Sequence, residues 1–267
     1  MDGQTLAAEM ALRTPTGWRL TWHGDDHTIA ANDENGLVVF ASVPSILLAA
    51  DLDEDALMKT VLEATEERIE WCKSWDALRD KAFVSIRPLE AASDPAYARY
   101  TRWITGEVTG VLSASLGSHS TLLPDATLRK LGVNGAILWA AAAKNLERWF
   151  RGRTWEVSGP PREYVTMQHG PVYLVSDPEL KTSSLIVLPR LIEEIAHEMA
   201  LPRFSFSVPA EGNVLIAGHT ADARHALSMV SKNIIRDIRQ NAPHLQALSS
   251  EVFRIENGSA VSTEPIH

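Results

Sequence analysis

The sequence predicts an α+β fold with mixed, mainly antiparallel sheets and packed helices, arranged as one large domain or two sub-domains. Two observations support this class. The chain has 267 residues and is 45% hydrophobic, which is enough material for a buried core. Segments with strand patterns mostly follow one another, and helical segments stand between these groups. A doubly wound parallel sheet would instead alternate strands and helices.

The N-terminal part carries the patterns of two helices and three strands. Residues 4–13 form the first predicted helix. Residues 18–22 alternate apolar and polar side chains, as a half-buried strand does. Residues 27–31 and 37–41 form a predicted hairpin, because the segment between them contains Asn and Gly, which accept positive φ. Asp53 then caps a long helix whose acidic first turn complements the helix dipole.

The middle of the chain continues with two strands and two helices. Strands are predicted over residues 82–87, which precede a proline, and 107–116. A short helix over residues 125–131 ends at Gly132. Asn134 caps the helix that follows and runs to about residue 150.

The second half is rich in strands. They are predicted over residues 164–169, 172–175, 184–188, 203–208, 213–217 and 251–255. Pro189 begins a helix, at the position where a missing N–H costs least, and this helix runs to about residue 199. Thr220 caps a long helix that Pro243 ends.

Loop signals divide the chain into regions. Residues 151–154 and 158–161 are rich in Gly, Pro and polar residues. We therefore expect an N-terminal α+β region over residues 1–150 and a C-terminal α+β region over residues 151–257. Residues 258–267 are expected to form a flexible tail.

Charge and cysteine content narrow the classes of function. The net charge is −9, whereas a nucleic-acid binder usually carries a basic surplus that neutralises phosphates, so a nucleic-acid partner is not favoured. The single cysteine, Cys72, excludes an intrachain disulfide and a cysteine-based zinc site. The N-terminus lacks the basic start of a signal peptide, and no apolar run has the length of a membrane span. We therefore expect a cytoplasmic protein with no membrane association.

Several segments, in a fixed order, carry a resemblance to a known family. They are the segment FVSIRP (83–88), the strand over 106–116, the helices in LRKLG…AAAAKNLERW, and later SSLIVLP, LIEEIAHEM and FSFSVPAEGNVLIAG. Together they cover about residues 80–220 and resemble the YtpQ-like family of uncharacterised bacterial proteins. This chain has Pro-Ala-Glu-Gly (209–212) where a polar Pro-Ser-Arg-Asp-like turn is expected in the family. The resemblance implies an intracellular α+β protein and supplies no catalytic residue.

Two groups of side chains have the chemistry of metal ligands. His23, Asp25 and His27 lie in one predicted turn, where imidazole and carboxylate groups would suit a divalent cation. Glu194 and His197 stand three apart on a helix, as in one half of a di-iron site. The simpler interpretations are a polar hairpin turn and a solvated helix face, since no second Glu-x-x-His pair lies in a predicted helix.

Two further polar features have structural interpretations. Asp222 and His225 stand three apart at a helix start, where the acid is more simply a first-turn residue that complements the helix dipole. Cys72 lies on the apolar side of a predicted helix near three glutamates, which is the setting of a buried thiol rather than of a nucleophile.

Aromatic and basic residues after the central helix form a candidate binding surface. Trp149 and Trp155 flank Arg151 and Arg153, and exposed Trp beside Arg is typical of protein-interface hot spots. The same pattern also occurs at the edge of a core. The three arginines 148, 151 and 153 would suit an acidic partner or a phosphate, although they make a small patch.

The sequence contains none of the common hydrolase or nucleotide-binding motifs, and no cofactor is predicted. The leading hypothesis is therefore an intracellular protein-binding module: an adaptor, a chaperone-like factor, or an immunity or defence component. The alternative is a metal-assisted enzyme whose site is assembled from distant parts of the chain.

Overall fold

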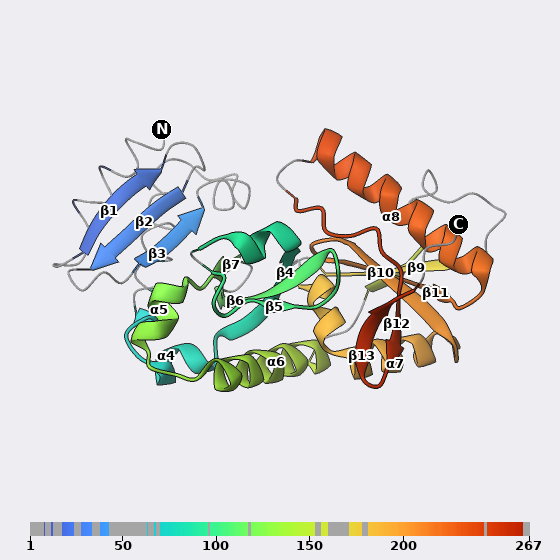
Figure 1. Ribbon diagram of the computed structural model, residues 1–267, viewed down its shortest axis with the longest axis horizontal. Coiled ribbons are helices and arrows are strands. Elements are labelled where there is room, and N and C mark those ends of the chain that lie inside the picture. The colour runs from blue at the N-terminus through green and yellow to red at the C-terminus, as the bar shows by residue number, and fades with distance from the viewer. Residues whose placement is uncertain are drawn as a thin grey trace. The chain divides into compact units, whose positions relative to one another are not determined.

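The computed structural model confirms the α+β class. It describes residues 18–23, 28–33, 38–42, 70–95, 97–116, 119–152, 156–159, 171–177, 181–242 and 245–263, together with Ala8, Leu12, Glu63 and Glu67. Helices accompany antiparallel sheets of three and six strands, and a further sheet has four strands (Figure 1). None of the helices in these ranges combines the length and the hydropathy that a membrane span needs.

The chain forms two compact units, each made of two segments. The first unit comprises Met1–Phe83 and Leu112–Ala142, and the second comprises Val84–Val111 and Ala143–His267. The strand pair β4 and β6 and the helix α6 each pass from one unit into the other. The expected boundary at residue 150 stays a prediction about independent folding.

The three-stranded sheet of the first unit is an antiparallel meander of β1 (Trp18–His23), β2 (Thr28–Asp33) and β3 (Val38–Ser42). This confirms the strand predicted at 18–22 and the hairpin predicted at 27–31 and 37–41. The helices predicted at 4–13 and after Asp53 lie mostly outside the described residues. Helical turns are present at the described positions 8, 12, 63, 67 and 70.

Local capping explains the three helices in the middle of the chain. In α4 (Trp75–Arg79), the Ser74 hydroxyl accepts a hydrogen bond from the Ala77 N–H at 3.2 Å. α5 (Asp125–Lys130) is followed by Gly132, whose φ of 65° favours glycine. α6 (Gly135–Arg151) begins where the Asn134 carboxamide oxygen accepts from the Ala136 N–H at 2.7 Å. The predicted end of one helix at Gly132 and the predicted start of the next at Asn134 are confirmed.

The four-stranded sheet has the order β4-β6-β5, with β7 paired to the other end of β6. Its strands are β4 (Ala82–Pro88), β5 (Arg102–Trp103), β6 (Val108–Leu116) and β7 (His119–Leu122). A short 3-10 helix, η1 (Leu89–Ser93), follows β4. The strands predicted at 82–87 and 107–116 are confirmed.

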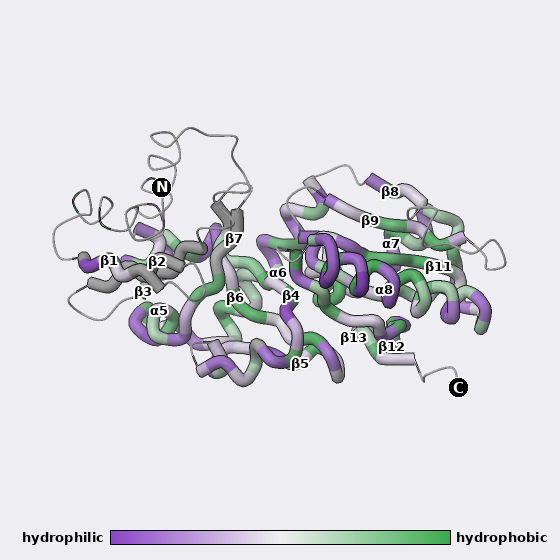
Figure 2. Tube along the Cα trace, turned by 90° about the horizontal axis from the view of Figure 1, so that it is seen from above, coloured by the Kyte–Doolittle hydropathy of each residue, from purple (hydrophilic) through white to green (hydrophobic). Residues whose placement is uncertain are grey.

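The six-stranded sheet of the second unit has the order β13-β12-β10-β11-β9-β8. Its members are β8 (Glu156–Ser158), β9 (Val172–Ser176), β10 (Phe204–Ala210), β11 (Asn213–Gly218), β12 (Phe253–Glu256) and β13 (Ser259–Ser262). β10 and β11 form a hairpin whose register shifts between Ser207 and Ala210, around Pro209, because a proline has no N–H for a regular ladder. Figure 2 shows hydrophobic residues along β11, at the centre of this sheet, and along its neighbour β9.

Helix α8 (Ala221–Asn241) covers one face of the six-stranded sheet. The Thr220 hydroxyl accepts from the Ala223 N–H at 3.2 Å, which confirms the predicted cap. Leu227, Val230 and Ile234 pack with Leu215 of β11 in one buried cluster. The Ser207 and Ser231 hydroxyls, both fully buried, bond to each other at 2.8 Å.

A 3-10 helix, η3 (Thr182–Val187), and α7 (Pro189–Glu198) also belong to the second unit, and η3 packs against β10 and β11. Figure 1 shows α8 above the sheet and α7 below it. On α7, Leu191, Ile192 and Ile195 are buried.

Two predictions in the second half are wrong. Residues 184–187 of the strand predicted at 184–188 belong to η3. The Asp177 carboxylate accepts hydrogen bonds from the N–H groups of Lys181 and Thr182 and from the Thr182 hydroxyl, which favours a helical turn there. The expected flexible tail over 258–267 is in part the strand β13, which pairs with β12. Asn257 and Gly258 both have positive φ and form the turn between these strands.

Candidate functional site

Two residues of the predicted binding surface, Trp149 and Arg151, make contacts inside the chain. The Arg151 guanidinium donates to both carboxylate oxygens of Glu194, at 3.0 and 3.1 Å, and to Glu147 at 3.0 Å. Trp149 is half-buried, meets the edge of Phe150, and has the Lys181 ammonium 4.8 Å from its ring centre. Arg153 and Trp155 lie outside the described residues, so this surface as a whole stays a prediction.

The predicted metal ligands are only partly described. His23 ends β1, its side chain is not described, and Asp25 and His27 lie outside the described residues. Glu194 and His197 are both exposed on α7, and Glu194 is the carboxylate that binds Arg151. Within the described ranges, no three His, Cys, Asp or Glu side chains gather closely enough to hold a metal ion.

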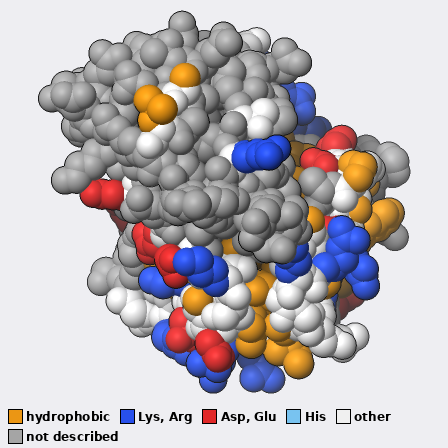
Figure 3. Space-filling model, turned by 90° about the vertical axis from the view of Figure 1, so that its left-hand side faces the viewer, with side chains coloured by type: hydrophobic (Ala, Val, Ile, Leu, Met, Phe, Trp, Pro, Cys, Tyr) orange, Lys and Arg blue, Asp and Glu red, His pale blue; other side chains and the backbone are white. Residues whose placement is uncertain are grey.

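The remaining polar residues considered in the sequence, Asp222, His225 and Cys72, do not gather into a site. Asp222 is exposed in the first turn of α8, and His225 is exposed one turn further on. Cys72 is a buried free thiol. On the face drawn in Figure 3, the described basic and acidic side chains lie interspersed.

A groove runs along α8 in the second unit. It consists of two adjoining pockets of about 370 and 800 Å³, which share Glu107, Lys232 and Ser250. The smaller pocket follows the N-terminal half of α8 from Arg224, and the larger one follows the C-terminal half to Gln240. We call this feature the α8 groove.

One wall of the α8 groove is basic. Arg224, Lys232, Arg236 and Arg239 line it at spacings of eight, four and three residues, which places them on one face of the helix. Arg236 donates to the Asn233 carboxamide at 2.7 Å. Among the described residues, no carboxylate lies within ion-pair distance of these four side chains.

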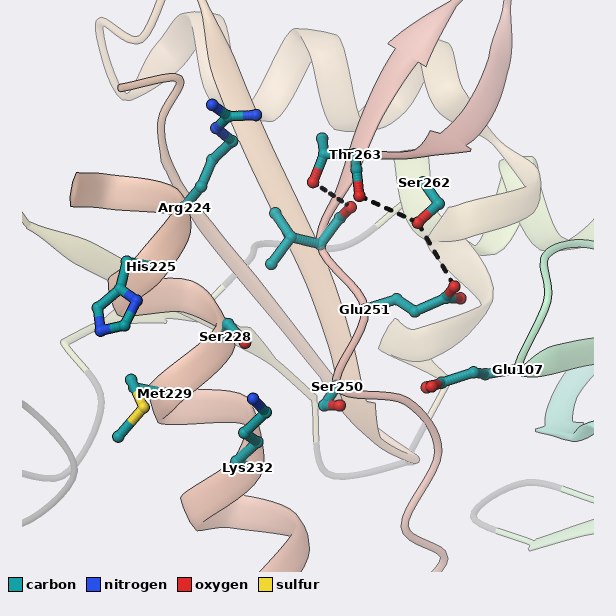
Figure 4. A pocket seen from close by; sticks show the side chains of 11 residues that line it. Glu107, Arg224, His225, Ser228, Met229, Lys232, Ser250, Glu251, Ser262 and Thr263 are labelled. Atoms are coloured by element: carbon teal, nitrogen blue, oxygen red, sulfur yellow. Dashed lines mark hydrogen bonds between the residues drawn. The ribbon is translucent and has the colours of Figure 1, made fainter. Parts of the chain in front are cut away.

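The opposite wall is acidic and comes from other segments. Glu107, which precedes β6, accepts a hydrogen bond of 2.6 Å from the Ser249 hydroxyl. One carboxylate oxygen of Glu251 accepts weakly from Ser262, and the other is buried without a hydrogen-bond partner. Figure 4 shows Lys232 on one side of Ser250 and the Glu107 carboxylate on the other.

The β10 bulge positions the segment that carries this acidic wall. The Pro209 and Val208 carbonyls accept from the N–H groups of Leu248 and Ser249, at 2.8 and 3.2 Å. These bonds dock the segment before β12 beside the sheet.

A second link holds the strand that leads toward Glu107. Arg87 at the end of β4 donates to Glu211 in the β10–β11 turn at 2.6 Å, and both side chains are mostly buried. The Leu89 N–H donates to the Glu107 carbonyl at 2.9 Å. The Arg87–Glu211 ion pair therefore links residues 84–111 to the β10–β11 hairpin.

An exposed tryptophan stands close to the acidic wall. Trp103 of β5 has an exposed fraction of 73%, and β5 packs against η1, which contributes Leu89 and Glu90 to the α8 groove. Nearby, burial raises the pKa of Tyr97 to about 12, and the negative charge of Asp94 adds to the rise. Large exposed aromatic side chains are frequent at protein interfaces.

The basic face of α8 is not among the features predicted from the sequence. The signal was present, because Lys232, Arg236 and Arg239 recur at helical spacing. Glu107 and Glu251 carried no such signal, since they come from segments far apart in the sequence. No protein-family model matches the chain, and neither a curated protein nor a solved structure matches it.

Proposed function

We propose that this protein is a protein-binding module that holds an acidic segment of a partner polypeptide in the α8 groove. The observation that carries the proposal is the row of basic side chains on α8, which have no carboxylate partners within the described residues. In a chain with a net charge of −9, such a row favours a negatively charged partner.

The two walls favour a polypeptide over a nucleic acid. Glu90, Glu107 and Glu251 line the groove opposite the basic face. A phosphate backbone carries negative charge along its whole length and would meet repulsion from these carboxylates. A polypeptide can direct acidic side chains to α8 and amide or basic groups to the other wall.

The dimensions suit an extended segment. Arg224 and Arg239 are fifteen positions apart on one helix, a rise of about 22 Å. An extended chain advances about 3.3 Å per residue, so about seven residues would span the basic row. Trp103, close to the acidic wall, adds an aromatic surface for an apolar side chain of the same segment.

The test is a selection of phage-displayed random peptides against the protein, followed by fluorescence anisotropy with the enriched peptides. We expect enrichment in Asp and Glu, and at least about a tenfold loss of affinity in the double variant Lys232→Glu/Arg236→Glu. The matched control is Lys144→Glu/Arg190→Glu, which makes the same charge change at two exposed residues outside the groove. Equal losses in both double variants, or no acidic enrichment, would refute the proposal.

The cytoplasm is the compartment we propose for this binding. The single cysteine is buried as a free thiol, which suits a reducing environment. Membership of the YtpQ-like family remains a proposal that rests on the resembling segments over about residues 80–220.

A further inference from the structure

Three arginines converge near the N-terminal end of α8. Phe204 of β10 pairs with Gly218 of β11, so Arg203 and His219 extend the same hairpin by one residue on each strand. Arg254 follows Phe253, which pairs with Phe206 of β10. Arg224 lies in the first turns of α8. We call Arg203, Arg224 and Arg254 the arginine cluster.

Side-chain alternation brings these groups to the α8 side of the sheet. Ser207 faces α8, because its hydroxyl bonds to Ser231, and Ser205 therefore faces the same way. The Ser205 hydroxyl lies 2.7 Å from His219 Nδ1, so this imidazole is on that side too. Phe253 packs on Phe206 on the opposite face, which leaves Arg254 on the α8 side.

The arginines act on His219 electrostatically. The pKa of His219 is lowered, first by burial and then by the positive charges of Arg224, Arg254 and Arg203. The three arginines therefore lie close enough to His219 to act on its charge.

Some hydrogen-bond donors of the arginine cluster have no acceptor, and only one of its positive charges is paired within the described part of the chain. The Nε–H groups of Arg224 and Arg254 are buried and have no hydrogen-bond acceptor. Buried donors without acceptors are rare in proteins, and an ion or water commonly fills such a place. Among the described residues, the only carboxylate paired with the cluster is Glu256, which binds the Arg254 guanidinium at 2.9 Å.

The nearby acids leave this charge in place. Asp222 is exposed in the first turn of α8, and the Glu251 carboxylate turns toward Ser262 (Figure 4). In the same view, Arg224 extends away from Lys232 and Glu107. Of the three guanidinium groups, only that of Arg254 is paired with a carboxylate of the described residues, so the cluster favours an anion.

We propose that the arginine cluster binds a phosphate group, carried either by free phosphate or by a phosphorylated side chain of a partner. Guanidinium groups bind phosphate oxygens through paired N–H donors, and a phosphorylated side chain is mainly dianionic at neutral pH. Arg224 also lines the α8 groove, so the phosphate group has a solvent-accessible approach. The site goes beyond the proposed function, since free phosphate tests it without any peptide.

The first experiment titrates the folded protein with inorganic phosphate at about pH 7.5, where phosphate is mainly dianionic, with sodium chloride holding the ionic strength constant. Calorimetry measures binding, and NMR measures the pKa of His219 with and without saturating phosphate. We expect saturable binding and a rise in the pKa of His219, because the bound anion offsets the arginine charges. If the titration gives no heat of binding and the pKa of His219 does not change, the proposal is refuted.

Variants locate the site on the arginine cluster. Arg224→Lys keeps the charge and removes the Nε–H and the planar fork, so the affinity for phosphate should fall about tenfold. Arg190→Lys is the matched control at an exposed position of α7 and should leave the affinity unchanged. Arg203→Lys, at an exposed position, is the second variant if Arg224→Lys does not fold. Wild-type affinity in a folded variant of the cluster would place the phosphate elsewhere.

A third experiment distinguishes free phosphate from a phosphorylated side chain. A phosphoserine peptide and its unphosphorylated form are compared with inorganic phosphate on the wild type and on Arg224→Lys. Tighter binding of the phosphopeptide, lost in the variant, identifies a phosphorylated partner, whereas equal affinity identifies free phosphate. If the affinities for phosphate and for the phosphopeptide are both unchanged in Arg224→Lys, the proposed site is refuted. Peptide binding that depends only on Lys232 and Arg236 would leave the proposed function intact.

Discussion

Helices α7 and α8 both belong to the six-stranded unit, yet their exposed charges are used differently. On α7, Glu194 is held by two hydrogen bonds from Arg151, which comes from the end of α6. On α8, Lys232 and Arg239 have no such partner among the described residues. An ion pair within the chain contributes to the fold, whereas a charge without a partner remains available to a ligand. Exposure alone therefore does not identify a binding face, and the pairing of its charges does.

The buried sides of the two helices should behave alike, and this gives the largest expected effect. Leu227 of α8 and Ile192 of α7 are both fully buried. Replacing either with Ala should lower the free energy of unfolding by about 3 kcal/mol, because each change removes apolar contacts and leaves a cavity. Urea denaturation measures the loss. Met229→Ala, at an exposed position of α8, is the control and should change stability by less than about 0.5 kcal/mol.

The next effect contrasts a paired charge with an unpaired one. Arg87→Met breaks the mostly buried ion pair with Glu211 and leaves a carboxylate without its partner, so the free energy of unfolding should fall by roughly 2 kcal/mol. Lys232→Met, on the basic face of α8, should stay within about 0.5 kcal/mol of the wild type. If denaturation shows equal losses, the distinction between structural and available charges is incorrect.

The smallest effect concerns the pH dependence of stability at the arginine cluster. Because the pKa of His219 is lower in the folded state than its ordinary value of about 6.5, the unfolded chain binds a proton first as the pH falls. Wild-type stability should therefore decrease relative to His219→Gln as the pH drops below about 6.5. Urea denaturation over a pH series measures this difference. A wild type that gains stability relative to the variant on acidification would mean that the pKa shift has the opposite sign.

Features that depend on neighbours in the sequence could be predicted. The caps at Asn134 and Thr220 and the start of α7 at Pro189 are confirmed, because capping and the missing proline N–H act within one helical turn. The β12–β13 hairpin also depends on a local signal, because Asn257 and Gly258 accept the positive φ values of its turn. The sequence analysis nevertheless predicted a flexible tail from residue 258.

The sequence by itself determined the α+β class, most of the described strands and the basic periodicity of α8, since these follow from hydrophobic patterning and helical spacing. Only the tertiary structure decided that the Arg87 guanidinium binds the Glu211 carboxylate. It also paired Arg151 with Glu194 and set Glu107 opposite Lys232. The physical reason is that a charge or a carbonyl acts on whatever group lies within a few ångströms, and folding chooses that group from distant parts of the chain.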